Sequence, residues 1–94
     1  MGGWYETIEP GIREQVRLLR ENGINTTYSC EHAMVIEAET YQDADLTHVA
    51  GLLSEAGYEE FLVEIQLFVK PGKGMWQRTL VVKFPMANGF ICQI

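Results

Sequence analysis

The sequence predicts a two-layer α+β fold, in which two helices cover one face of a four-stranded antiparallel sheet. Three observations support this prediction. Two segments repeat apolar residues at helical spacing, four segments have the composition of strands, and the segments follow one another in the order αββαββ. The chain has 94 residues, of which 47% are hydrophobic, so residues 1–94 are expected to form a single domain with its own core.

The first predicted helix begins at Pro10 and ends at Asn22-Gly23. Proline suits the first turn of a helix because its fixed φ is helical and its missing N–H is not needed there. Glycine suits the position after the last turn because it readily adopts the left-handed conformation of a helix cap. The apolar face of this helix comprises Ile12, Val16 and Leu19.

Two short strands follow and are expected to form a hairpin. Residues 25–30 are rich in threonine and tyrosine and are polar on both faces, which is typical of an edge strand. Residues 33–39 alternate between apolar and polar side chains, which favours a strand with one buried face. The connection between them is short, so the turn is predicted near Glu31 and His32.

The second helix is predicted to begin after Asp43, whose carboxylate suits the N-cap position, and to end at Gly57. Its apolar residues recur three or four positions apart, so they line one side of the helix. They are Leu46, Val49, Ala50, Leu53 and Ala56.

A second hairpin is predicted from two longer strands, at residues 58–70 and 76–84, joined by a turn at Pro71–Gly74. The first of these strands has the strongest strand pattern in the chain, with an apolar face that comprises Phe61, Val63, Ile65, Leu67 and Val69. The second is expected to turn inward Leu80, Val82 and Phe84, and outward Thr79, Val81 and Lys83. Asn88-Gly89 is a hairpin signal, which leaves open whether residues 90–94 form a fifth strand.

The order of these elements indicates a circularly permuted ferredoxin-like sheet, in which the strand that opens the usual βαββαβ order stands last. This topology predicts the sheet order third, fourth, second, first strand, with every neighbouring pair antiparallel. It also places the Cys30–His32 turn beside the start of the first helix. The Pro71–Gly74 turn is expected at the opposite end.

The sheet face that the helices leave open is predicted to be half apolar. Its apolar residues are expected to be Val35, Leu62, Phe68 and Val81. A mixed face of this kind often marks a surface for a partner, and the commonest partner of a small domain is a second copy of itself. We therefore expect a homodimer that forms through this face.

Cys30, Glu31 and His32 form a cluster of nucleophilic and metal-binding side chains. Cys30 and His32 stand two residues apart at a turn, where both can bind one metal ion, although a structural zinc site needs four ligands. Cys30 is alternatively a nucleophile, because a neighbouring imidazolium and the positive end of the first helix favour its thiolate. The competing interpretation is that Cys30 is a small buried side chain and His32 an exposed turn residue.

The segment at residues 18–32 resembles a segment of small uncharacterised bacterial and phage proteins that reads L-L-x-x-x-G-I-x-T-x-x-S-C-E-G-H. Here His32 follows Glu31 directly, without the glycine that separates these residues in those proteins. Residues 27–30 are more distantly similar to the Thr-x-Ser-Ser-Cys segment of wybutosine-synthesising methyltransferase-like proteins, which act on tRNA. The first resemblance covers residues 18–32 alone and implies no established activity.

Composition excludes several classes of protein. The net charge of −6 argues against a nucleic-acid-binding protein, and no apolar run is long enough to cross a membrane. The N-terminus shows no signal-peptide pattern, and two cysteines are too few for a disulfide framework, so we expect a cytoplasmic protein with reduced thiols. Pro71–Gly74 lacks the Lys-Ser/Thr ending and following helix of a phosphate-binding loop, so no cofactor is predicted.

These observations favour a non-catalytic module that binds a partner, or an unidentified small ligand, and dimerises through its open sheet face. The alternative is a small enzyme or metal-binding protein with its site at Cys30, Glu31 and His32. The first hypothesis expects an exposed apolar sheet face. The second expects a pocket into which Cys30 and His32 point. Whether the protein is an enzyme stays open from the sequence, as does the identity of any ligand.

Overall fold

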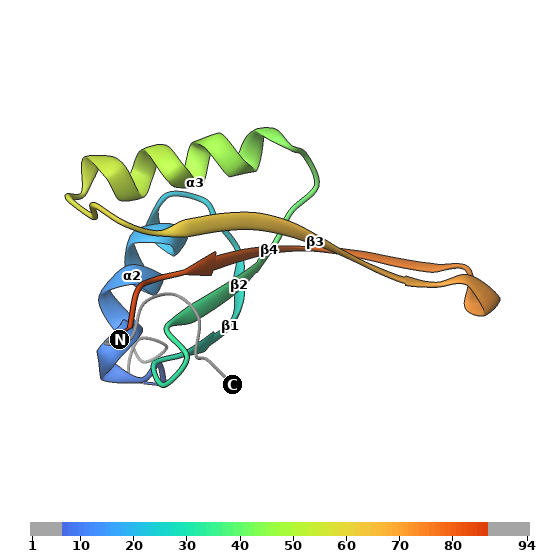
Figure 1. The fold of residues 1–94 in the computed structure, drawn as a ribbon, viewed down its shortest axis with the longest axis horizontal. Coiled ribbons are helices and arrows are strands. Elements are labelled where there is room, and N and C mark those ends of the chain that lie inside the picture. Colours follow the sequence, from blue (N-terminus) through green and yellow to red (C-terminus); the bar gives the residue numbers. More distant parts are fainter. Residues whose placement is uncertain (1–6, 87–94) are drawn as a thin grey trace.

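The computed structural model describes residues 7–86 and confirms the αββαββ order that the sequence predicts (Figure 1). The elements are α2 (Pro10–Glu21), β1 (Thr26–Cys30), β2 (Val35–Glu39), α3 (Ala44–Glu55), β3 (Leu62–Lys70), the 3-10 turn η1 (Pro71–Lys73) and β4 (Met75–Lys83). The strand predicted at residues 58–70 begins later than expected, at Leu62. The question of a fifth strand at residues 90–94 lies outside the described residues.

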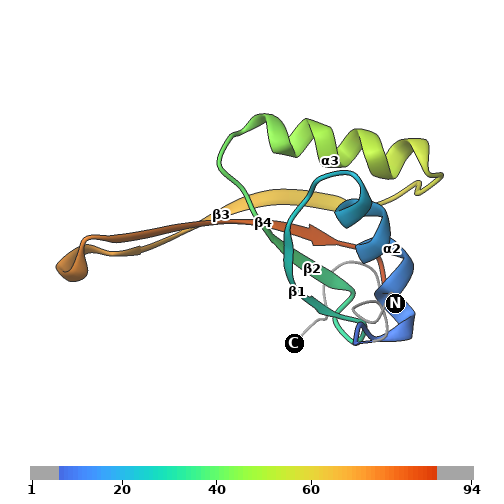
Figure 2. The same cartoon turned by 180° about the vertical axis from the view of Figure 1, so that it is seen from behind.

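The four strands form one antiparallel sheet in the order β1-β2-β4-β3, as the permuted ferredoxin-like topology predicts. β4 is central and pairs with β2 on one side and β3 on the other. β1 and β3 are therefore the two edge strands of the sheet. Figure 2, which views the molecule from behind, shows β1 at one of these edges. The turn after β1 and the turn η1 lie at opposite ends of the molecule, also as predicted (Figure 1).

Both helices pack on the same face of the sheet. That face carries Ile36 of β2 and Leu80 of β4, which are fully buried. The core that the helices and this face enclose comprises Ile12, Val16, Leu19, Ile24, Ile36, Ala38, Val49, Leu53, Leu80, Val82 and Phe84. The predicted apolar faces of α2 and of the inward side of β4 are thus confirmed. Gly23 and Gly57 follow the two helices with φ of 89° and 99°, which confirms their expected left-handed caps.

The start of α3 differs from the prediction. Asp43 has helical dihedral angles and makes no capping hydrogen bond, so it is not the expected side-chain cap. Its carboxylate instead accepts a hydrogen bond from Arg78 Nη2 of β4 at 2.6 Å. The buried Thr40 donates from its hydroxyl to Asp45 Oδ2 in the first turn of α3 at 2.7 Å. The acidic residue in the first turn of α3 is therefore Asp45, whose carboxylate is fixed by the hydrogen bond from Thr40. Negative charge in the first turn of a helix is favourable.

Thr40→Val is expected to raise the pKa of Asp45 toward its ordinary value, because the hydrogen bond from Thr40 is the main cause that lowers this pKa. A carboxyl whose pKa is lower in the folded chain stabilises the fold above its unfolded pKa of about 3.9, and this contribution disappears as the pH falls through the folded pKa. The variant should therefore be less stable than wild type at neutral pH, and the difference should shrink in acid.

An NMR titration of the Asp45 carboxyl, combined with denaturation at several pH values, measures both effects. Thr47→Val is a matched control, because the Thr47 hydroxyl donates to the carbonyl oxygen of Ala44 and not to a carboxylate. An unchanged Asp45 pKa in Thr40→Val would show that this hydrogen bond does not govern the titration.

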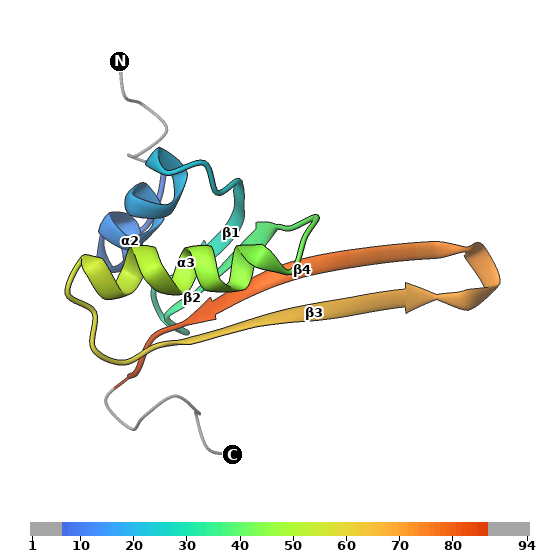
Figure 3. The same ribbon diagram turned by 90° about the horizontal axis from the view of Figure 1, so that it is seen from above.

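The β3–β4 hairpin extends well beyond the rest of the sheet (Figures 1 and 3). The pairing of β2 with β4 ends at Glu39 and Thr79, so the part of the hairpin between Leu67 and Arg78 pairs only with itself. We call residues 67–78 the hairpin arm. Leu67 and Val69 continue the apolar face of β3 as predicted, but both are exposed on the arm, because they lie beyond the five residues of β2.

Candidate functional site

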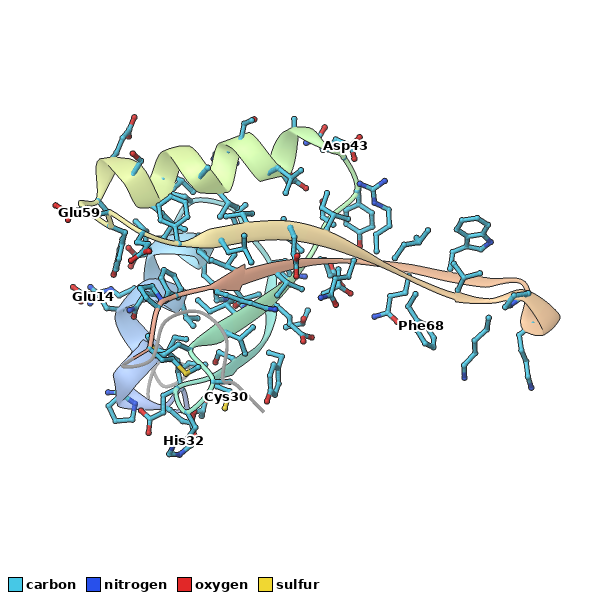
Figure 4. All side chains as sticks on the ribbon, viewed as in Figure 1. Glu14, Cys30, His32, Asp43, Glu59 and Phe68 are labelled. Carbon is cyan, nitrogen blue, oxygen red and sulfur yellow. The ribbon has the colours of Figure 1, made fainter. Side chains whose placement is uncertain are left out.

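The turn after β1 is tied to the start of α2 by two hydrogen bonds. The backbone N–H of Gly11 donates to Glu31 Oε1 at 2.6 Å, and the backbone N–H of Glu31 donates to Glu9 Oε1 at 2.6 Å. The first bond satisfies one of the N–H groups that a helix start leaves without a partner in the helix. Glu31 thus places a carboxylate at the positive end of α2, where negative charge is favoured. This confirms that the turn and the helix start share one end (Figure 4).

The same end brings together three side chains that can bind a metal ion. Ligand atoms of Glu9, Glu31 and His32 all lie within 4.8 Å of one another, with the two glutamates half-buried and the histidine exposed. Sequence reasoning found Glu31 and His32 but missed Glu9. The available signal was that Glu9 directly precedes Pro10, the expected helix start, which the topology places beside the turn.

Cys30 does not join this group of ligands. It is half-buried at the end of β1, beside Tyr28, two residues earlier on the same strand. The Cys30 thiol is the largest cause that raises the pKa of the Tyr28 hydroxyl. Among the described residues, the group that the structure brings together therefore contains His32 and two carboxylates, while the pairing of Cys30 with His32 stays a prediction.

A hollow lies beside β1, at the edge of the sheet. Its volume is ≈ 390 Å³, and its lining comprises Thr7, Ile8, Arg20, Thr26, Thr27, Tyr28 and Ser29. The guanidinium of Arg20 donates to the carbonyl oxygen and the hydroxyl of Thr26, at 2.8 and 3.1 Å. This lining ends at Ser29, one residue before Cys30, so the hollow does not supply the pocket that a catalytic Cys30 and His32 would need.

The open sheet face carries the four predicted interface residues in different environments. Leu62 and Phe68 are 41% and 50% exposed, whereas Val35 is half-buried. Val81 lies on this face as predicted, but it is only 2% exposed, so the expectation that it forms part of an exposed apolar surface is wrong. Val81 is on the central strand, where it lies between Glu37 of β2 and Glu64 of β3 in the register of the sheet. Of the four predicted residues, Leu62 and Phe68, both on β3, are thus the exposed ones.

The hairpin arm exposes apolar side chains on both of its faces. Phe68 points away from the helices, with Lys70 Nζ 5.8 Å from the centre of its ring (Figure 4). The other face, which continues the core side of the sheet, carries Leu67, Val69 and Trp76, of which Trp76 is 70% exposed. Val69 and Trp76 are directly opposite each other across the hairpin. The arm therefore offers an apolar surface that nothing in the described chain covers.

Charge is distributed unevenly along the chain. All thirteen acidic residues precede position 65, whereas four of the seven basic residues follow it. The four basic residues are Lys70, Lys73, Arg78 and Lys83. Two of these cations already have acidic neighbours, since Arg78 contacts Asp43 at 2.6 Å and Lys83 contacts Glu64 at 3.7 Å. The outer part of the arm, with Lys70 and Lys73, is thus basic, while the rest of the chain is strongly acidic.

Neither α2 nor α3, the helices of the described part of the chain, has the length and apolar character that crossing a bilayer requires. Comparisons of the sequence with profiles of known protein families and with curated proteins, and of the fold with solved structures, found no match. What this chain does must therefore be inferred from its own geometry, in which the hairpin arm and the turn at Glu31 are the two features to explain.

Proposed function

We propose that this chain is a non-catalytic interaction module that associates with a second copy of itself through the open face of its sheet and the hairpin arm. One observation supports this proposal above the others. Among the described residues, five of the seven large apolar side chains that are exposed belong to β3 and β4, namely Leu62, Leu67, Phe68, Val69 and Trp76. An apolar surface concentrated on one hairpin is typical of a protein interface.

The stability of the arm supports the same proposal. A two-stranded hairpin that packs on nothing is at best marginally stable in water. The arm nevertheless extends the pairing by four residue pairs beyond the last pair of β2 with β4, from Leu67–Arg78 to Lys70–Met75. Covering its large apolar side chains would stabilise it, at roughly 25 cal/mol for each Å² of apolar surface removed from water. A second copy is the commonest partner that supplies such a cover.

Sedimentation velocity over a range of concentrations tests this proposal. Phe68→Ser is expected to weaken association at least about tenfold, because buried aromatic anchors contribute about 1.4 kcal/mol or more to an interface. Gln77→Ser is the matched control, since Gln77 lies directly opposite Phe68 on the same face of the arm. Wild-type protein that stays monomeric at every concentration, or Phe68→Ser protein that associates as wild type does, would contradict the proposal.

A divalent-cation site at the turn is the second candidate function. The observation that favours it is the proximity of Glu9, Glu31 and His32, because two carboxylates and an imidazole are ligands for Zn²⁺ or Mn²⁺. Two features oppose it: one oxygen of each carboxylate already accepts a backbone N–H, and the positive end of α2 disfavours a cation. A cation bound here would lie at the surface of the protein, since His32 is exposed, and it could hold a second molecule there.

Calorimetric titration with Zn²⁺ and with Mn²⁺ tests this candidate. His32→Ala and Glu9→Gln should each abolish binding, whereas Cys30→Ser should leave it unchanged because Cys30 does not belong to the group. Binding that is lost in Cys30→Ser and kept in Glu9→Gln would return the site to the pairing of Cys30 with His32. The absence of any heat of binding would rule out this second candidate.

A further inference from the structure

The outer edge of β3 is the longest exposed backbone edge of the sheet. β3 has nine residues, against five for β1 at the other edge, and no strand of the described chain pairs with its outer side (Figure 3). Exposed edges of this length are templates for pairing with another chain, so proteins usually shorten them, cover them or protect them with charge. Here six of the nine residues are apolar, which is poor protection.

We propose that β3 pairs in antiparallel orientation with β3 of a second copy, around a two-fold axis at Ile65, so that the two sheets become one eight-stranded sheet. This inference rests on the proposed function, that two copies associate, and it places the contact at the edge of β3 and the arm. Across that edge, the exposed Leu62 and Phe68 of the open face would lie side by side with those of the partner. A two-fold axis is compatible with this contact, since two identical antiparallel strands are related by a two-fold axis perpendicular to their sheet.

The sequence of β3 is self-complementary in this register. On the open face, Leu62 comes opposite the partner's Phe68, and Glu64 comes opposite the partner's Gln66. On the helix side, Val63 comes opposite the partner's Leu67, and Ile65 comes opposite the partner's Ile65. Apolar side chains therefore meet apolar side chains on both faces, and such cross-strand pairs are what stabilises a sheet.

The neighbouring registers fit less well. An axis at Gln66 would place Glu64 opposite the partner's Phe68 and Leu62 opposite the partner's Lys70. Both exposed apolar residues of the open face would then meet charged groups, which is unfavourable for cross-strand pairs. An axis at Glu64, the other neighbouring register, would place Glu64 opposite the partner's Glu64, which is an unfavourable like-charge pair. Of the three registers, the pattern of β3 therefore favours the axis at Ile65.

The same register also accounts for the arm and its charge. Residues 67–70 of the arm would lie along residues 60–63 of the partner, at the start of its β3 and just before it, so the arm would no longer be an isolated two-stranded hairpin. On the helix side, a row across the extended sheet would consist of Trp76, Val69 and the partner's Phe61. Lys70 would come beside the partner's Glu60, so the acidic pair Glu59-Glu60 would face the basic end of the arm. This charge complementarity favours a second copy of the chain over nucleic acid as the partner.

Disulfide cross-linking tests this contact in protein that also carries Cys30→Ser and Cys92→Ser. Residues directly opposite each other in an antiparallel pair have Cα atoms about 4.5–5.5 Å apart, which is within the range that a disulfide spans. Ile65→Cys should therefore form a covalent dimer on mild oxidation. Because Ile65 is half-buried, the double variant Glu64→Cys/Gln66→Cys provides a second test. Its two positions come opposite each other in this register, and neither belongs to the core or to the apolar side chains of the contact.

Three results are informative. Covalent dimers of Ile65→Cys and of Glu64→Cys/Gln66→Cys, together with a Gln66→Cys control that forms no covalent dimer, would support pairing around Ile65. Sedimentation that shows a wild-type dimer, combined with no cross-link in either variant, would overturn the β3 contact while the proposed function stands. Wild-type protein that is monomeric at all concentrations would overturn both.

Discussion

Leu53→Ala is expected to lower the free energy of unfolding by about 2–5 kcal/mol. Leu53 is fully buried in the third turn of α3, within the core that also contains Val49 of the same helix. Truncation removes apolar area from the core and leaves a cavity that the surrounding β-sheet closes only partly. A small domain has a total stability of about 5–15 kcal/mol, so this single change removes a large part of it.

Urea denaturation followed by circular dichroism measures this loss. Leu52→Ala is the matched control, because Leu52 is the adjacent residue of α3 and is only partly buried. Its loss should be clearly smaller than that of Leu53→Ala. Equal losses for the two variants would mean that α3 does not pack on the sheet by the face described above. Both variants should be measured at the same protein concentration, because self-association would add to apparent stability.

Gly11→Ala is expected to destabilise the fold by about 1 kcal/mol, because losing the hydrogen bond to the Glu31 carboxylate costs about 1.5–3 kcal/mol and alanine regains about 1 kcal/mol of helix propensity. A Cβ atom at position 11 would lie 2.5 Å from Glu31 Oε1 and 3.1 Å from Glu31 Cβ. The methyl group would therefore displace the carboxylate that accepts the N–H of Gly11. Absence of a side chain at this first-turn position is thus what allows the turn and the helix start to approach so closely.

A double-mutant cycle with Glu31→Ala separates this clash from the general effect of alanine in a helix. In the Glu31→Ala background, Gly11→Ala should lose most of its cost, because the displaced carboxylate is no longer there. Gly72→Ala is a useful control, since no atom lies within 4 Å of a Cβ built at Gly72. A cost of Gly11→Ala that is the same with and without the Glu31 side chain would contradict the contact.

Much of the fold could be predicted because local patterns and topology agreed. Helical spacing placed Ile12, Val16 and Leu19 in the core, and the order of elements was enough to place β1 and β3 at the sheet edges. The arm could not be predicted in the same way. Leu67 and Val69 continue the alternation of the buried face, and only the short length of β2 leaves them exposed. Periodicity indicates which face of a strand is apolar, but not how far the neighbouring strand extends.

The candidate site was predicted in part. Topology correctly placed the Cys30–His32 turn beside the start of α2, because an antiparallel helix and strand that follow each other return to the same end. Which side chains contact one another at this end was harder to predict, because it depends on where each side chain points in the folded chain. Cys30 lies on the same face as Tyr28 because alternate residues of a strand share a face. His32 lies beyond the end of the strand, and its ligand atom is within 4.8 Å of that of Glu9.

The arm also has a consequence for the dynamics of the chain. Its backbone hydrogen bonds join only β3 and β4 between Leu67 and Arg78, so they can open without disturbing the core. Amide protons of the arm should then exchange with deuterium through local fraying, while those of Ile36 and Leu80 exchange only when the whole domain unfolds. Slow exchange in the arm would mean that another molecule covers it. The amide groups of the unmodified protein therefore report whether the arm is bound to a partner.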